Sequence, residues 1–282
     1  MSHHARGVWL MIISTACFTA NVLLVRALGE VESVNVWLVS CVRFVAGMGV
    51  IYAVYRNDFQ FTRLFTNSKL AGRGIVGGAG VYAFYLTVVH LGAGRATFIN
   101  NTYVIFGALL AVGMLGEPFR MPLAIGSTAA LTGLALLTNA FAAGSHTGLY
   151  DLIAVITALG SAYVVVTIRQ LHATEHTSTI FAAQCVYGLL LCAIPAAFQF
   201  RAVSALAWIM MSLAGVFASV GQIAMTRAFR DLPVAEGSLL QMLVPLGIAV
   251  GGVIFFAERF AMHEIIGALL ILGGSAFTAV RR

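Results

Sequence analysis

Charged side chains are scarce in this sequence, in which Asp, Glu, Lys and Arg make up 9% of the 282 residues. A soluble domain carries about 25% of such residues, and so few charges cannot cover the surface of a folded chain of this length in water. Hydrophobic residues make up 60% of the chain, and the mean hydropathy is +0.96. The composition excludes a soluble enzyme, a nucleic-acid-binding protein and a disordered scaffold, and it predicts an integral membrane protein whose apolar surface faces the lipid bilayer.

The sequence also lacks the residue patterns of disulfide-bonded, metal-binding and catalytic proteins. Its four cysteines all lie inside apolar runs, which favours small buried hydrophobic residues: Cys17, Cys41, Cys185 and Cys192. It contains no His-Glu-x-x-His motif, no Gly-x-Ser-x-Gly motif and no pair of aspartates within an apolar run. We therefore expect no enzymatic activity, no metal site and no cofactor.

The apolar residues form long continuous runs rather than the short alternating strands of a membrane barrel. A helix needs about 20 apolar residues to cross a bilayer, and the chain is long enough for ten such helices. We predict an all-α protein with ten membrane-spanning helices near residues 7–27, 34–54, 74–91, 95–115, 121–139, 148–168, 178–198, 204–226, 234–256 and 263–280. The first run is too long for the hydrophobic part of a signal peptide, so we expect it to be retained.

Lysine and arginine residues fall mostly on one side of these spans. If the N-terminus is cytoplasmic, the inner loops and ends hold eleven of them, the outer side holds four, and Arg43 lies within the second span. Cytoplasmic loops carry an excess of positive residues, so we expect a multi-pass protein of the cytoplasmic (inner) membrane with both termini inside. The inner set is Arg6, Arg56, Arg63, Lys69, Arg73, Arg120, Arg169, Arg227, Arg230, Arg281 and Arg282, and the outer set is Arg26, Arg95, Arg201 and Arg259.

The sequence repeats itself after 141 residues, which is half of its length. Glu117 aligns with Glu258, and glycines behind them align too: Gly126 with Gly267, and Gly133 with Gly274. We therefore predict two halves of five spans each, residues 1–141 and 142–282. Because five is odd, the halves must cross the membrane in opposite orientations, an arrangement that recurs in secondary transporters.

These features resemble the drug/metabolite transporter superfamily, specifically its EamA branch. The resemblance covers nearly the whole chain and depends on these residues: Arg43-Phe44, Gly116-Glu117, Gly126, Pro245, Glu258 and Gly267, with Ala257 standing where the second half of the family usually has glycine. The resemblance implies transport by alternating access.

The leading hypothesis is an exporter of small organic metabolites, such as amino acids or related compounds. One alternative is an importer of a vitamin-like or nucleoside-like aromatic solute. An alternative of another class is a non-transporting membrane scaffold, although a scaffold would not require inverted halves. The expected partners are a small organic solute and the lipid bilayer, with no nucleic acid, while proton coupling and homodimerisation stay open.

Polar residues occupy matching depths in spans four and nine. The 141-residue shift aligns Thr97 with Ser238 and Asn100 with Gln241. Positions 97, 100 and 104 share one helical face, as do positions 238, 241 and 245, and Asn101 and Tyr103 extend the polar character of span four. These side chains suit a solute site at the membrane midplane between the halves, and the alternative is that they form hydrogen bonds between helices.

Spans three and eight repeat this pattern with aromatic and amide side chains. Tyr82 and Tyr85 share a helical face in span three, and Gln222 lies in span eight. An aromatic wall with a few amides suits an aromatic or amphipathic solute, although tyrosines near span ends also form interfacial belts. Arg43 binds either a carboxylate or phosphate of the solute, or backbone carbonyls between helices.

Carboxylates are expected at helix ends rather than inside the membrane. Glu117 and Glu258 follow spans four and nine, where each is expected to cap the first turn of the next helix. Asp151, Glu236 and Glu264 are expected in first turns as well. No carboxylate is predicted at mid-membrane, and His90, at the end of span three, is a candidate proton carrier because of its ordinary pKa range.

Overall fold

The computed structural model describes residues 2–91, 93–118, 120–140, 148–257, 259 and 261–280. Within these ranges the chain forms thirteen helices and no strand. The helices are α1 (His3–Val31), α2 (Val36–Tyr55), α3 (Arg63–Thr66), α4 (Ser68–Leu91), α5 (Ala93–Asn101), α6 (Tyr103–Leu115), α7 (Met121–Leu137), α8 (Leu149–Leu171), α9 (Thr177–Phe198), α10 (Ala205–Asp231), α11 (Val234–Gln241), α12 (Leu243–Phe256) and α13 (Met262–Val280).

The helices follow the apolar runs of the sequence, as predicted for a chain in lipid. Seven helical segments among the described residues are long and apolar enough to cross a membrane, and two of them join α5 to α6 (Arg95–Leu115) and α11 to α12 (Val234–Phe256). The whole of α7 and residues Met262–Phe277 of α13 are shorter apolar helices. The all-helical membrane fold is therefore confirmed, and the count of ten spans stays a prediction.

Many large apolar side chains point outward. Phe198 is 87% exposed, and Phe255 and Met262 are each 72% exposed. Exposed apolar surface of this extent is stable when it faces lipid rather than water. The four cysteines are free. Cys185 and Cys192 are buried, as the sequence predicts, whereas Cys17 and Cys41 are only half-buried.

The chain divides into two compact units. Unit 1 comprises residues Met1–Tyr82 and Thr167–Asp231, and unit 2 comprises residues Ala83–Val166 and Leu232–Arg282. Of the three divisions, two fall inside α4 and α8, and the third falls between α10 and α11. Each unit therefore contains helices from both halves of the sequence.

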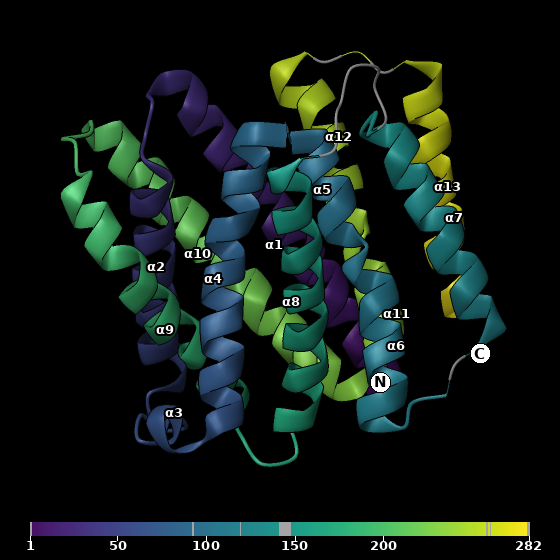
Figure 1. Cartoon of the computed structure of the whole chain (residues 1–282), viewed down its shortest axis with the longest axis horizontal. Coiled ribbons are helices and arrows are strands. Elements are labelled where there is room, and N and C mark those ends of the chain that lie inside the picture. The colour runs from purple at the N-terminus through teal and green to yellow at the C-terminus, as the bar shows by residue number, and fades with distance from the viewer. Residues whose placement is uncertain are drawn as a thin grey trace. The chain divides into compact units, whose positions relative to one another are not determined.

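In unit 1, α2 packs against α9 (Figure 1). The ring of Phe44 occupies the space that a side chain on Gly188 would need, and a Cβ on Gly47 would lie 2.6 Å from Sγ of Cys185. The residue numbers rise along α2 while they fall along α9, so the two helices run antiparallel. The 141-residue shift turns the Gly47–Cys185 contact into the Gly188–Phe44 contact.

In unit 2, α7 packs against α13 (Figure 1). A Cβ on Gly133 would lie 2.5 Å from the carbonyl oxygen of Gly267, and a Cβ on Gly274 would lie 2.5 Å from the carbonyl oxygen of Gly126. These helices also run antiparallel, and the same shift exchanges the two contacts. Small residues allow this close approach, so these glycines pack the two helices together.

Candidate functional site

The segments predicted as spans four and nine are each interrupted once, at nearly the same place in the two halves. The regular α-helical hydrogen bonding is interrupted at Thr102, between α5 and α6, and at Met242, between α11 and α12, while both residues keep right-handed helical backbone angles. The amide of Thr102 donates to the carbonyl of Ile99 (3.1 Å), and that of Met242 donates to the carbonyl of Leu239 (3.0 Å). Both are bonds to the third preceding residue, which tighten one turn.

The two interruptions have different local causes. In the first half, the hydroxyl of Thr102 donates to the carbonyl of Ile99 (2.6 Å), and Nδ2 of Asn101 donates to the carbonyl of Thr97 (2.8 Å). Side chains that bond to the backbone in this way compete with the helical ladder. In the second half, Pro245 has no N–H to donate to the carbonyl of Gln241 and its ring crowds that carbonyl.

The predicted polar residues of unit 2 lie beside these interruptions. Oδ1 of Asn100 accepts a hydrogen bond from the hydroxyl of Ser161 on α8 (3.4 Å). The hydroxyl of Tyr103 donates to the backbone carbonyl of Ser238 (3.5 Å), so α6 and α11 meet here. Gln241 is buried. The structure thus links Asn100 to α8 and joins Tyr103 to Ser238.

The side-chain hydroxyl of Ser238 is a further polar group in this region. Its side chain is fully buried, and within the described part of the chain its hydroxyl makes no hydrogen bond. Thr97 and Asn100 are half-buried, and Asn101 is buried. Unit 2 therefore presents hydroxyl and amide groups around both interruptions. Tyr85, also in unit 2, is half-buried and makes a tilted ring contact with Phe84.

The other predicted site residues lie in unit 1. Tyr82 stacks on Trp37, with ring centroids 3.5 Å apart and planes at 12°. Gln222 is buried, and Arg43 is half-buried on α2, with its backbone close to Gly215 of α10. Tyr82 is therefore held in a stacked ring pair with Trp37 inside unit 1.

Glu117 makes a contact that the sequence did not predict. Its Oε2 accepts the amide of Val234 (3.0 Å), the first residue of α11. The carboxylate therefore stabilises the start of a helix from the other half of the sequence. Glu258, its counterpart, lies outside the described residues. Asp151, Glu236 and Glu264 fall in first turns, as predicted.

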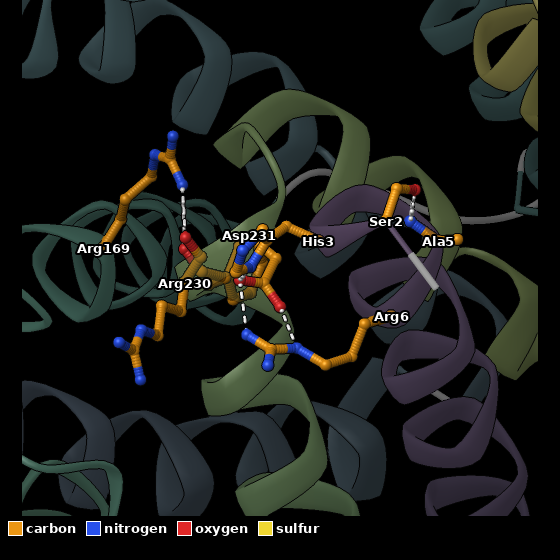
Figure 2. Close-up of polar contacts among 8 residues, drawn as sticks. Ser2, His3, Ala5, Arg6, Arg169, Arg230 and Asp231 are labelled. Carbon is orange, nitrogen blue, oxygen red and sulfur yellow. Dashed lines mark hydrogen bonds and ion pairs between the residues drawn. The ribbon is translucent and has the colours of Figure 1, made fainter.

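At one end of unit 1, charged and polar groups bond to the C-terminal part of α10. The guanidinium of Arg6 donates to both carboxylate oxygens of Asp231 (2.8 and 3.0 Å), which ties the start of α1 to the end of α10 (Figure 2). Arg169 donates to the carbonyl of Phe229 (3.0 Å), and Nε2 of His172 donates to the carbonyl of Thr226 (2.6 Å). Burial lowers the pKa of His172, which follows the last residue of α8.

Unit 2 contains a comparable ion pair between other elements. Arg95 of α5 lies 2.8 Å from Oδ1 of Asp151 on α8, and the rings of His90 and Tyr150 stack with centroids 3.8 Å apart. His90 is thus part of an aromatic contact at the end of α4. Among the described residues, no group of three His, Cys, Asp or Glu side chains could hold a metal ion.

Arg73 is the residue that sequence reasoning placed in the wrong environment. It was expected in a cytoplasmic loop, yet it lies in α4 and is fully buried. Its neighbours Gly72 and Gly74 are the signal that could have found it, because small residues let another helix approach closely. A Cβ on Gly74 would lie 2.6 Å from the carbonyl oxygen of Ala183 on α9.

Comparison with known proteins agrees with this architecture. The family described as "EamA-like transporter family" matches the chain twice, over residues 5–139 and 148–280. A solved structure titled only "Crystal structure of protein" has a TM-score of 0.80 and 16% sequence identity, covering 98% of this chain and 97% of its own. At that identity the likeness shows the fold alone. No curated protein matches the sequence.

Proposed function

This chain belongs to the EamA-like transporter family, and from that premise we propose that it is a secondary transporter of the drug/metabolite type that works by alternating access. It exports small organic metabolites such as amino acids across the cytoplasmic membrane. Its ten spans form two inverted halves, residues 1–141 and 142–282, with both termini in the cytoplasm.

Two pairs of equivalent helices support the inverted arrangement. α2 is equivalent to α9 and α7 is equivalent to α13 under the 141-residue shift, and each pair packs antiparallel. Their contacts are reciprocal, which is the property of an interface around a two-fold axis. An odd number of spans in each half accounts for both observations.

The observation that carries the proposal is the pair of interrupted helices. The breaks at Thr102 and Met242 fall beside polar side chains, in two helical segments that are otherwise long and apolar. Transporters of this kind place their solute sites at discontinuous helices, where backbone and side-chain polar groups face the solute. A helix that served only to pack against its neighbours would not need such a break.

We assign the solute contacts to the polar groups beside the breaks. Asn100 and Gln241 are the central pair. The further candidates beside the breaks are Thr97, Asn101, Tyr103 and Ser238. Tyr85 is a candidate elsewhere in unit 2, and Tyr82, Gln222 and Arg43 are separate candidates in unit 1. The fully buried hydroxyl of Ser238 supports this assignment, because a buried polar group without a partner is costly unless a ligand satisfies it in part of the transport cycle.

Transport by purified protein in proteoliposomes tests the proposal. Vesicles loaded with a pool of L-amino acids should exchange them for external labelled amino acids, and empty vesicles should not. Asn100→Leu and Gln241→Leu should each weaken apparent affinity about tenfold to hundredfold, because a solute polar group loses its partner. Asn57→Leu, in an exposed turn, is the matched control and should transport as the wild type does.

The remaining outcomes separate the alternatives. Exchange of labelled nucleosides but not of amino acids would favour the aromatic-solute importer. Folded wild-type protein that moves neither pool would favour a scaffold. A dependence of the rate on an imposed pH gradient would establish proton coupling. Cysteines introduced at Lys69 and Arg201, both exposed in unit 1, should label from opposite sides of the membrane, with Lys69 cytoplasmic.

A further inference from the structure

Arg73 of α4 carries a positive charge that no described residue compensates. Its side chain is fully buried, and none of its three guanidinium nitrogens has a hydrogen-bond partner in the described ranges. A guanidinium removed from water is strongly destabilising unless a counter-charge or several acceptors satisfy it. Within a membrane protein, a buried arginine of this kind marks a candidate site for a ligand.

The carboxylates of unit 1 are not available to Arg73. Helices α2, α4 and α9 contain no Asp or Glu. The acidic residues elsewhere in unit 1 are either bonded to other residues or exposed: Glu32 to Ser204, Glu175 to Asn67, Asp231 to Arg6, with Glu30 and Asp58 exposed. Unit 1 therefore supplies no carboxylate for Arg73, and a negatively charged ligand would provide the missing charge.

A buried hydrogen-bond acceptor lies at the same α4–α9 contact as Arg73. Gln184 is 5% exposed, and its Nε2 donates to the carbonyl of Gly77 (3.5 Å), one helical turn beyond Arg73. Oε1 of Gln184 is buried and has no partner among the residues with defined positions. The next residue along α9, Cys185, packs against Gly47 of α2, one helical turn beyond Arg43.

We propose that Arg73 and Gln184 bind the carboxylate end of a transported solute. The planar guanidinium fork pairs with two carboxylate oxygens, and Oε1 of Gln184 accepts from a hydroxyl or ammonium group on the neighbouring carbon. Arg43 adds a second positive charge nearby. This site rests on the transporter function proposed above, and it narrows the solutes to small hydroxy acids and amino acids.

The glycines around Arg73 bring α4 and α9 close together. A Cβ on Gly74 or on Gly78 would lie 2.6 Å from the backbone of α9, at Ala183 and Gly188 respectively. The side chains of Tyr187 and Gln184 also pack on this glycine face, at Gly74 and Gly77. Because Arg73 is fully buried, solute access requires α4 and α9 to separate.

Thermal stability of the purified full-length protein tests the site with three small probes. Sodium propionate carries the carboxylate, propionamide is its neutral analogue, and sodium L-lactate adds a hydroxyl group. Propionate should raise the melting temperature, L-lactate should raise it further, and propionamide and an equal concentration of sodium chloride should leave it unchanged. An equal shift with sodium chloride, or no shift with propionate, would overturn the proposal.

Variants assign the shift to the named residues. Arg73→Gln should abolish the propionate shift and should raise the melting temperature of the unliganded protein, because it removes an uncompensated charge. Arg201→Gln, at an exposed position in the same unit, should behave as the wild type. Gln184→Leu should reduce the L-lactate shift to that of propionate. An unchanged propionate shift in Arg73→Gln would overturn the site.

A second variant covers the case in which Arg73→Gln does not fold. Arg73→Lys keeps the charge but loses the planar fork, so the half-saturating propionate concentration should rise about tenfold; an unaltered value would overturn the site. The two proposals fail separately. Amino-acid exchange that is equal in Arg73→Lys and wild type refutes the site alone, whereas an Arg73-dependent propionate shift in a protein that moves no solute refutes transport alone.

Discussion

The α2–α9 contact of unit 1 and the α7–α13 contact of unit 2 have the same symmetry, but different kinds of atoms pack in them. Between α7 and α13, glycines bring backbone against backbone, as at Gly133 and Gly267. Between α2 and α9, side chains occupy the glycine positions, as the ring of Phe44 does at Gly188. Each pair joins equivalent helices of the two halves.

The surroundings of the two contacts differ as well. Cys185 lies on the α9 side of the first contact, and Arg43 lies on α2 one helical turn before Gly47, whereas the second contact is lined by glycine, alanine, leucine and isoleucine. Side-chain packing can adjust by rotation about single bonds, but a backbone contact cannot. We infer that the α7–α13 contact stays unchanged during transport. We infer that the α2–α9 contact can adjust and belongs to the part of the protein that binds solute.

The largest predicted effect is an added methyl group in the α7–α13 contact. Gly267→Ala places a Cβ 2.5 Å from the carbonyl oxygen of Gly133, so the two backbones must separate at a cost of about 3 kcal/mol. The melting temperature and the yield of folded protein should both fall. Gly273→Ala, on the same helix with no atom within 4 Å of its Cβ, is the control and should keep or slightly raise stability.

The second prediction concerns the α2–α9 contact, where a second substitution should restore the stability that the first one removes. Gly188→Ala should destabilise the protein by about 2 kcal/mol, because the new methyl group overlaps the Phe44 ring. The double variant Gly188→Ala with Phe44→Leu should recover at least half of the lost stability, since the obstructing atoms belong to a side chain. A double-mutant cycle of melting temperatures measures this coupling. If rescue fails, the distinction between the two contacts is wrong.

The sequence predicts the helices well because lipid leaves an apolar run few alternatives. It fails where protein rather than lipid surrounds the chain. α4 begins at Ser68 and not at the predicted residue 74, because Lys69 and Arg73 lower the hydropathy of a segment that is partly buried in unit 1. The break at Pro245 follows from the residue itself, whereas the break at Thr102 depends on side-chain bonds that no hydropathy pattern contains.

For the candidate site, helical spacing predicts depth but not partners. The pairing of Asn100 with Gln241 needs only the 141-residue shift. The bond from Ser161 to Asn100, and that from Val234 to Glu117, join segments far apart in the sequence. Arg73 escaped prediction because a glycine-flanked arginine beside a lysine also matches the pattern of a cytoplasmic loop.

A third, smaller effect compares the ends of α6 and α12, which occupy equivalent positions in the two halves. Both helices end in a left-handed residue, Gly116 with φ +66° and Ala257 with φ +53°. Glycine adopts this conformation without strain and alanine does not. Ala257→Gly should therefore stabilise the protein by about 1 kcal/mol, and Gly116→Ala should destabilise it by about as much. Chemical denaturation of both variants checks the opposite signs.

The smallest predicted effect is a pH dependence confined to unit 1, at the α8–α10 contact where His172 donates to the carbonyl of Thr226. Burial lowers the pKa of His172, so the unfolded chain takes up a proton more readily than the folded protein does. The stability that His172 contributes is complete above the unfolded pKa of about 6.5 and is lost as the pH falls below it. Hydrogen exchange should therefore show that α10 loses protection near Thr226 at acidic pH. The α7–α13 contact should keep its protection, because its described glycine neighbours include no titrating group. His172→Gln retains a donor that cannot titrate and should remove the difference. Equal loss of protection in both contacts, or a persistent pH effect in His172→Gln, would show that the pH response does not come from this histidine.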